Sequence, residues 1–441
     1  MENNVYYKRK IDSVLQDWAK ESDRKPLLLR GARQVGKSSA VRNLAKMFEN
    51  YVEVNFENEK EIHVIFEKYN SPQEICEQLS LFYNIEIIAG RTLVFFDEIQ
   101  SCPAAFSRMR FFYEKYQDLH LIAAGSLLEF AIEEMASFAV GRIRSIFLYP
   151  FSFEEFLSAG KEDMLIKAYK RAKPKNPLSL PIHNELLKLL KIFLIIGGMP
   201  EAVAEYIKTK SFLKSRMVLD DLITALKSDF AKYKKRIQSV HIENVFDSIA
   251  SQAGGKFIYE KVAHLNNIQV KQSLELLIMA GLVIPVIHSS ANGIPLGAEA
   301  NNKRRNMLLF DTGIFLRMLD FESSQIIIAD DFKTINMGVI AEMFAGLEIL
   351  KAASCYSPHR LYFWHREKKQ SNAQVDYIIQ KNNYIIPIEV KSGTKGSMTS
   401  LRIFMQEKNS KMGIRASLEN FGEMENVLIY PLYAISNIIT E

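Results

Sequence analysis

The segment from Gly31 to Ser38 constrains the fold of this chain more than any other feature. It reads G-A-R-Q-V-G-K-S, follows the short apolar run 26–29 and precedes residues 37–50, where apolar side chains recur at helical spacing. The pattern G-x-x-x-x-G-K-[ST] between a strand and a helix is typical of a phosphate-binding loop, because its glycines let successive backbone N–H groups surround phosphate oxygens. The sequence therefore predicts a strand–loop–helix unit that holds the phosphates of a nucleotide.

The residues of this loop have expected roles toward ATP and Mg²⁺. The Lys37 ammonium is expected to reach the β- and γ-phosphates, and the Ser38 hydroxyl to ligate Mg²⁺. The predicted nucleotide contacts are Gly31, Ala32, Arg33, Gln34, Val35, Gly36, Lys37, Ser38 and Ser39.

Two further apolar runs end in polar side chains. The run 93–96 leads into Asp97 and Glu98, and the run 121–124 leads through a glycine into Ser126. Because ligands of parallel sheets bind at the carboxyl ends of the strands, Asp97 is predicted to hold Mg²⁺ and Glu98 to polarise the attacking water. Ser126 either senses the γ-phosphate or caps the helix that follows it, and both roles are compatible.

The distribution of apolar runs predicts an α/β fold with several modules. Short, wholly apolar runs alternate with helical stretches over the first 150 residues, as in a parallel sheet covered on both faces. Helical periodicity then dominates 182–235, and 241–317 reads as short helices followed by a hairpin, which favours a winged helix. From about 334 a helix, 337–351, precedes three strand-like runs and a last helix; the runs are 360–364, 374–380 and 384–390.

The motifs together resemble a prokaryotic AAA-type ATPase family whose members carry a C-terminal domain similar to a restriction endonuclease. The resemblance rests on the loop, on D-E-I-Q at 97–100, on Gly125-Ser126, on Gly141-Arg142 before 148–156, on G-G-M-P-E at 197–201 and on the C-terminal pattern below. It implies an ATPase core with a helical lid. Arg142 then becomes a candidate for an arginine that contacts the γ-phosphate, in the same chain or in another copy; Arg144 competes for this role, and a plain surface arginine is the alternative.

Carboxylates near the C-terminus resemble the PD-(D/E)xK nuclease pattern. Asp376 lies in one strand-like run, Glu389 and Lys391 close the next, and Glu342 lies on the preceding helix, although no proline precedes Asp376. Asp376 and Glu389 would converge on Mg²⁺, and Lys391 would orient water or stabilise developing charge. The alternative is a degenerate, nuclease-like fold in which these residues form salt bridges and the domain only binds a partner.

Charge, cysteine content and hydropathy limit the partners and the cellular compartment that this chain is expected to have. The 56 basic and 51 acidic residues give a net charge of only +5, so any nucleic-acid surface must be local. Basic stretches at 227–236 and 303–305 are candidates for phosphate contacts with DNA or RNA, although a charge run is usually a solvated helix face. Three scattered cysteines and a polar start favour a reduced, cytoplasmic protein without a signal peptide, and 186–199 is too short and too charged to span a membrane.

The sequence thus predicts four modules: an ATPase core at 1–155, a helical lid at 156–236, a winged-helix-like domain at 237–325 and a restriction-endonuclease-like α/β domain at 326–441. The expected function is Mg²⁺-dependent ATP hydrolysis that controls a nuclease-like domain. A regulatory switch with an inactive, partner-binding C-terminal domain is the alternative, and the oligomeric state stays open.

Overall fold

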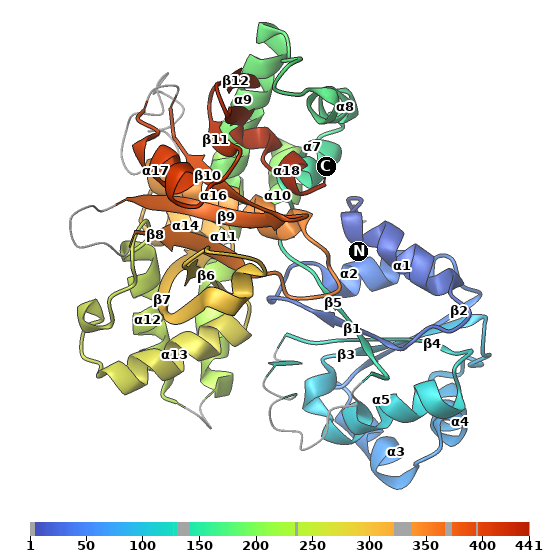
Figure 1. The fold of residues 1–441 in the computed structure, drawn as a ribbon. Coiled ribbons are helices and arrows are strands. Elements are labelled where there is room, and N and C mark those ends of the chain that lie inside the picture. Colours follow the sequence, from blue (N-terminus) through green and yellow to red (C-terminus); the bar gives the residue numbers. More distant parts are fainter. Residues whose placement is uncertain are drawn as a thin grey trace. The chain divides into compact units, whose positions relative to one another are not determined.

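The computed structural model describes residues 5–126, 128, 129, 132, 141–233, 237–321, 337–366, 373–393 and 396–440. The chain divides into two compact units (Figure 1). The first comprises Met1–Pro150, Met279–Gly281 and Cys355–Pro358, and the second comprises Phe151–Ile278, Leu282–Ser354 and His359–Glu441.

The first unit is a parallel sheet between helices. Its elements are α1 (Lys10–Lys20), β1 (Leu27–Arg30), α2 (Lys37–Ala45), β2 (Asn50–Asn55), α3 (His63–Lys68), α4 (Pro72–Tyr83), β3 (Thr92–Asp97), α5 (Pro103–Lys115), β4 (His120–Ala124) and β5 (Arg144–Phe147). The strand order is β2-β3-β4-β1-β5, and all four pairings are parallel. Helices α1 and α2 lie on one face and α3, α4 and α5 on the other (Figure 1).

The parallel sheet predicted from the apolar runs is confirmed. Every residue of β3 and β4 is buried, which explains why these strands are continuous apolar runs rather than alternating ones. Since the strands are parallel, the ends of β1, β3 and β4 meet at one edge of the sheet, and the polar residues that follow them are brought together there.

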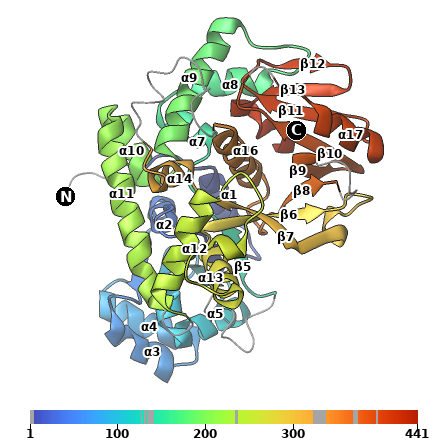
Figure 2. The ribbon, with the colours of Figure 1, turned by 90° about the vertical axis from the view of Figure 1, so that its left-hand side faces the viewer.

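The second unit combines a helical part with a large mixed sheet. Its helices are α7 (Phe153–Ala159), α8 (Asp163–Arg171), α9 (Leu180–Ile196), α10 (Pro200–Thr209), α11 (Phe212–Asp229), α12 (Ser239–Ser251), α13 (Asn267–Met279), α14 (Thr312–Met318), α16 (Met337–Ala352), α17 (Thr399–Glu407) and α18 (Asn437–Thr440). Its strands are β6 (Val283–Ser289), β7 (Ala300–Leu309), β8 (Leu361–His365), β9 (Gln374–Lys381), β10 (Tyr384–Val390), β11 (Gly413–Ser417), β12 (Gly422–Met424) and β13 (Val427–Pro431). Helices α9, α10 and α11 pack beside one another (Figure 2).

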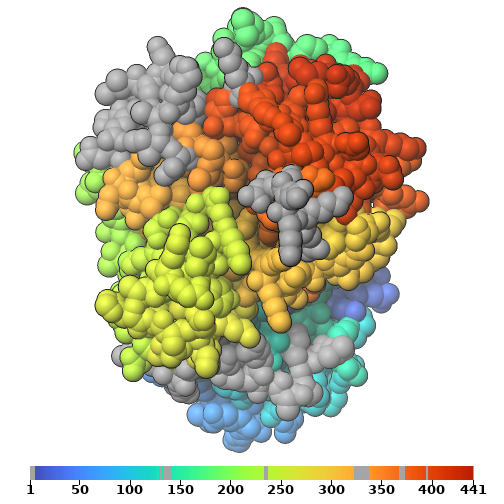
Figure 3. All heavy atoms as spheres, turned by 60° about the vertical axis from the view of Figure 1, so that its left-hand side comes forward, coloured from blue at the N-terminus to red at the C-terminus, as the bar shows by residue number. Residues whose placement is uncertain are grey.

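The hairpin of β6 and β7 is part of the C-terminal sheet. The strand order is β12-β13-β11-β10-β9-β8-β6-β7, and β6 pairs with β8 in parallel, with Val286 opposite Leu361. On the face in Figure 3, the yellow and gold residues of this hairpin continue into the orange and red residues of the C-terminal strands. The sheet therefore contains strands from both sides of the predicted domain boundary at 325/326. The division into lid, winged helix and C-terminal domain stays a prediction.

Two of the family-like motifs have a structural role in this unit. The Gly198 N–H donates to Asp311 Oδ2 at 2.6 Å, and the Phe151 N–H donates to the Gly198 carbonyl at 2.7 Å. A Cβ on Gly198 would lie 2.3 Å from the Phe151 carbonyl oxygen, so only glycine fits this junction. The Phe151 carbonyl also accepts a bond of 2.9 Å from Lys351 Nζ, and Glu348 accepts from the Phe153 N–H, which fixes α16 against this corner.

None of the described helices has the length and apolar content needed to cross a lipid bilayer.

Candidate nucleotide and carboxylate sites

The glycines of the loop between β1 and α2 occupy positions that other residues do not tolerate. Gly31 has φ +142°, and a Cβ there would lie 2.1 Å from the Leu148 carbonyl oxygen. Gly36 has φ +94° and precedes the first residue of α2 in a left-handed conformation. The chain therefore turns sharply out of β1 and directs the N-terminus of α2 at the loop, as a phosphate site requires.

Lys37 lies folded within this loop. Its ammonium donates to the carbonyls of Gly31 at 2.9 Å and Ala32 at 2.8 Å, and the residue is only 7% exposed. Burial lowers the pKa of Lys37 to about 8, against the opposing effect of the carboxylates of Glu98 and Asp97. An anion bound at the loop would favour the charged form of this lysine.

The other residues of the loop differ in their exposure to solvent and in their effect on Lys37. The charge of the half-buried Arg33 lowers the pKa of Lys37 further. Val35 and Ala32 are buried, whereas Gln34 and Ser39 are exposed, Gln34 with a left-handed φ of +62°.

The two predicted Mg²⁺ ligands are in contact. Ser38 Oγ donates to Asp97 Oδ2 at 2.9 Å, across from α2 to the end of β3. Burial raises the pKa of Asp97, and the bond from Ser38 counters it. A hydroxyl beside a carboxylate is a donor set of hard oxygen atoms that suits Mg²⁺, so these residues fit the expected ion.

Glu98 is held by two polar side chains. Its Oε2 accepts a hydrogen bond of 2.5 Å from Gln100 Nε2 and longer ones from the Ser126 N–H at 3.4 Å and Oγ at 3.3 Å. A Cβ on Gly125 would lie 1.9 Å from Gln100 Oε1, so the glycine makes room for this glutamine. Ser126 thus contacts the predicted catalytic glutamate, while the helix it would cap lies partly outside the described residues.

Sequence reasoning missed the role of Gln100. It quoted this residue only as the end of the D-E-I-Q motif. Its contact depends on the turn Ile99–Ser101 after β3 and on the absence of a side chain at Gly125, two features that are distant in sequence.

The structure corrects the expectation for Arg142 in the same chain. Arg144 is opposite Leu27, the first residue of β1, whereas the phosphate loop follows the last residue of β1. Arg142 and Arg144 therefore lie at the end of the sheet opposite to the loop, where Arg142 pairs with Glu114 and Arg144 with Glu21. A γ-phosphate role within one chain is incompatible with this parallel register, and a role toward another copy stays a prediction.

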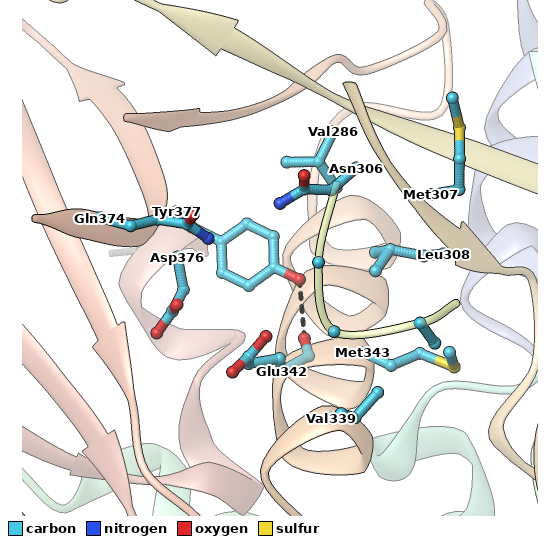
Figure 4. A pocket seen from close by; sticks show the side chains of 13 residues that line it. Val286, Asn306, Met307, Leu308, Val339, Glu342, Met343, Gln374, Asp376 and Tyr377 are labelled. Atoms are coloured by element: carbon cyan, nitrogen blue, oxygen red, sulfur yellow. Dashed lines mark hydrogen bonds between the residues drawn. The ribbon is translucent and has the colours of Figure 1, made fainter. Parts of the chain in front are cut away.

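In the second unit, the structure brings the four predicted C-terminal site residues together. The Val390 N–H donates to Asp376 Oδ2 at 2.8 Å, and Lys391 Nζ donates to Glu389 Oε1 at 2.7 Å. Glu342 on α16 and Asp376 on β9 both line one narrow pocket, of about 20 Å³, and Figure 4 shows their carboxylates near each other. This volume holds little more than a water molecule or an ion.

The pKa values of Glu342 and Asp376, which line this pocket, and of Glu389, whose charge acts on both, are all raised. Burial raises the pKa of Glu342 to about 7, with Lys391 opposing and Glu389 reinforcing the shift. Burial and then the charges of Glu342 and Glu389 raise the pKa of Asp376, and burial raises the pKa of Glu389. Three carboxyls with one nearby lysine form an electrostatic environment that a cation would relieve.

Arg415 is a further basic residue beside this pocket that sequence reasoning missed. It lies opposite Glu389 in the register of β10 and β11, and its charge lowers the pKa of Glu389. Its Nη1 donates to the Gly396 carbonyl at 3.2 Å, and its Nε lies 3.1 Å from a Glu419 carboxylate oxygen. The signal was a charged residue inside the buried strand Gly413–Ser417.

The fit of a metal ion to this pocket is partial. No group of three or more histidine, cysteine, aspartate or glutamate side chains within the described residues is arranged to hold a metal. Mg²⁺, however, usually keeps several waters and binds one or two carboxylates. Glu389 Oε2 is buried and has no hydrogen-bond partner among the described residues, so Glu389 and Asp376 supply such a pair.

Three residues of the basic stretches form ion pairs, Lys227, Lys232 and Arg305. Arg305 on β7 pairs with Glu275 at 2.8 Å, and Lys227 pairs with Asp247 at 2.8 Å. Lys303 and Arg304 are exposed on β7. Residues 234–236 of the first stretch lie outside the described residues, and contact with nucleic acid stays a prediction.

Comparisons with known proteins divide the chain into three matched regions. Residues 23–157 match the family described as an AAA domain. Residues 187–325 and 337–435 match two domains of unknown function, DUF8612 and DUF4143. The first unit therefore contains an AAA-type P-loop ATPase domain, whereas the endonuclease-like fold of the C-terminal region stays a prediction. No curated protein matches the chain.

Several solved structures are distantly similar. A Walker-type ATPase of Pyrococcus abyssi is 15% identical and matches over 71% of this chain and 96% of its own, with a TM-score of 0.45. The Orc1 protein of Aeropyrum pernix, solved in complex with DNA, is 15% identical over 72% of this chain and 93% of its own, with a TM-score of 0.27. PCH-2 of C. elegans is 14% identical over 46% of this chain and 63% of its own, with a TM-score of 0.28.

Proposed function

We propose that the first unit binds ATP with Mg²⁺ at the loop Gly31 to Ser38 and hydrolyses it. The observation that supports this proposal most is the Ser38–Asp97 contact, because it places a hydroxyl and a carboxylate beside the phosphate loop. The AAA domain match over 23–157 agrees with it.

Different residues of the site bind the phosphates, hold the metal ion and activate water. The N–H groups of the loop and the N-terminus of α2 hold the phosphates, and Lys37 exchanges its two carbonyl acceptors for phosphate oxygens. Ser38 and Asp97 hold Mg²⁺, which supplies charge neutralisation when bound. Glu98 orients a water molecule and accepts its proton, while Gln100 and Ser126 fix the position of the Glu98 carboxylate.

Nucleotide binding by Lys37→Ala tests this proposal. The variant is expected to lose ATP binding in a fluorescent-nucleotide titration, whereas Lys46→Ala, an exposed lysine just beyond α2, should bind as the wild type does. Undiminished ATP hydrolysis by Lys37→Ala overturns the assignment.

A second proposal concerns the carboxylate pocket, where we infer a Mg²⁺-dependent phosphodiesterase site controlled by the ATP cycle. The observation in its favour is the assembly of Glu342, Asp376, Glu389 and Lys391 from α16, β9 and β10. Asp376 and Glu389 would hold Mg²⁺, which as a Lewis acid supplies activation of water when bound. Lys391 would stabilise the charge that develops on the phosphate.

Incubation of the purified chain with DNA or RNA and Mg²⁺, with and without ATP, tests this second proposal. Cleavage that Glu389→Ala abolishes supports it. Equal cleavage by Glu389→Ala excludes the pocket. The alternative, a switch whose C-terminal region only binds a partner, predicts instead a pull-down that depends on the nucleotide state and persists in Asp376→Asn.

A further inference from the structure

The unit that carries the carboxylate pocket contains a second cavity, and Tyr377 lines both. This sheet cavity, of about 390 Å³, is formed by β8 and β9, the turn at 295–297, α16 and the C-terminal α18. Its apolar lining comes from five separate segments: Leu296, Ile349, Leu361, Ile379, Ile438 and Ile439. A volume of this size, lined mainly by apolar side chains, is within the range of small-molecule sites in proteins.

The charged residues of the sheet cavity all have one sign. Arg360 and Lys381 line it, and none of its lining residues carries a carboxylate. Lys381 Nζ donates to the Ile438 carbonyl at 3.1 Å, which uses one of its three N–H donors and ties α18 to the end of β9. No ion pair involves Arg360 among the described residues, so Arg360 and the remaining N–H donors of Lys381 are available to an anionic ligand.

The walls are held in place by local contacts. Gln380 Oε1 accepts a hydrogen bond of 3.2 Å from the Leu296 N–H, which fixes the turn 295–297 against β9. Gly297 faces the hydroxyl of Tyr362, which would lie 3.1 Å from a Cβ at that position. The cavity is therefore a formed site on secondary structure rather than a gap between loops.

We propose that the sheet cavity binds an amphipathic anion, with a carboxylate or phosphate head at Arg360 and Lys381 and an apolar body against the isoleucines. The apolar lining supplies affinity through burial of the body, and the two cations select a charged head over a neutral one. A medium-chain acyl group or a flat aromatic ring system fits this description.

The position of the cavity also connects it with the carboxylate pocket. Tyr377 lines both, and its hydroxyl donates to the Glu342 carbonyl at 2.7 Å. An occupant of the sheet cavity therefore contacts the ring that supports α16 at Glu342. The binding proposal does not depend on the activity of the carboxylate pocket, so each can fail alone.

The test is a fluorescence titration of the full chain with anilinonaphthalene sulfonate, an aromatic anion, followed by displacement with decanoate, decyl phosphate and neutral decanol. We expect saturable binding at one site, displaced by decanoate or decyl phosphate far better than by decanol. The stronger of the two anions identifies the head group that the site prefers.

Three variants connect the binding with the cavity. Arg360→Glu/Lys381→Glu is expected to weaken binding at least about tenfold, because both attractive charges become repulsive. Gly297→Leu fills the wall and is expected to abolish binding while thermal unfolding stays cooperative. Lys271→Glu, an exposed lysine on α13 away from the cavity, is the matched control and should leave binding unchanged.

Two results overturn the proposal. If decanol displaced the probe as well as decanoate does, the two cations would not distinguish a charged head group from a neutral one. Binding that survives both Gly297→Leu and the double charge reversal would place the probe elsewhere on the chain.

Discussion

Removal of the Gln100 side chain separates a positioning role from a merely structural one. Gln100→Ala deletes the 2.5 Å bond to Glu98 Oε2 and leaves only the two bonds of 3.3 and 3.4 Å from Ser126. A hydrogen bond to a charged group contributes about 1.5–3 kcal/mol. If that energy serves to orient Glu98 in the transition state, kcat falls about 10- to 100-fold.

The affinity for ATP is expected to stay near the wild-type value in this variant. Among the described residues, Lys37 and Ser38 form their hydrogen bonds with groups other than Gln100, so the ground-state contacts of the nucleotide should be unaffected. The assay is steady-state phosphate release together with a fluorescent-nucleotide titration.

Gly125→Ala supplies an independent perturbation of the same contact. The new methyl group would lie 1.9 Å from Gln100 Oε1 and must displace that side chain. Gly125 has no positive φ, so alanine fits its backbone. Gly125→Ala should therefore lower kcat about as much as Gln100→Ala, and the double variant should be no slower than either single one, because the two changes remove one interaction.

Additive effects would refute this reasoning. They would show that Gly125→Ala damages the site in another way. A Gln100→Ala variant with unchanged kcat would show that Ser126 alone is sufficient to hold Glu98.

Three other predictions concern buried charges. Because the pKa of Lys37 is about 8 and bound phosphates raise it, ATP binding at pH 8 should take up about half a proton in calorimetry across buffers of different ionisation enthalpy, and binding without proton uptake would contradict this role of Lys37. Asp311→Ala leaves the buried Gly198 N–H without its acceptor and should lower the free energy of unfolding by about 2–3 kcal/mol in urea titrations. An unchanged unfolding midpoint would contradict the stabilising role of this hydrogen bond. In the folded chain the pKa of Glu342 is raised to about 7. The charged form of Glu342 therefore destabilises the fold increasingly as the pH rises from the pKa of the unfolded chain to 7. Glu342→Gln should stabilise the chain at pH 8, by up to about 3 kcal/mol, and should not stabilise it at pH 4.

The nucleotide site could be predicted because its determinants are local. Apolar runs identify β1, β3 and β4, and a parallel sheet brings their ends together without any knowledge of long-range contacts. Asp97 and Ser38 follow from that rule alone. Gln100 does not, because its contact with Glu98 depends on a turn conformation and on a glycine 25 positions further along the chain.

Other features of the fold depend on which strands pair, and the periodicity of apolar residues does not reveal strand pairing. The hairpin of β6 and β7 joins the C-terminal sheet through a parallel partner, β8, more than 70 residues away in sequence. The same-chain role of Arg142 was wrong because it ignored the direction of β5, which starts beside the start of β1. Once that register is known, both arginines belong to the end of the sheet opposite to the loop.

The most direct test of the ATPase assignment is phosphate release and nucleotide retention by Glu98→Gln. The substitution preserves the size and hydrogen-bonding shape of the side chain but removes the base that accepts the proton of water. With Lys37, Ser38 and Asp97 intact, we predict that the purified variant retains ATP after gel filtration and releases phosphate at least about 100-fold more slowly than the wild type. Phosphate release at the wild-type rate would contradict the central role of Glu98.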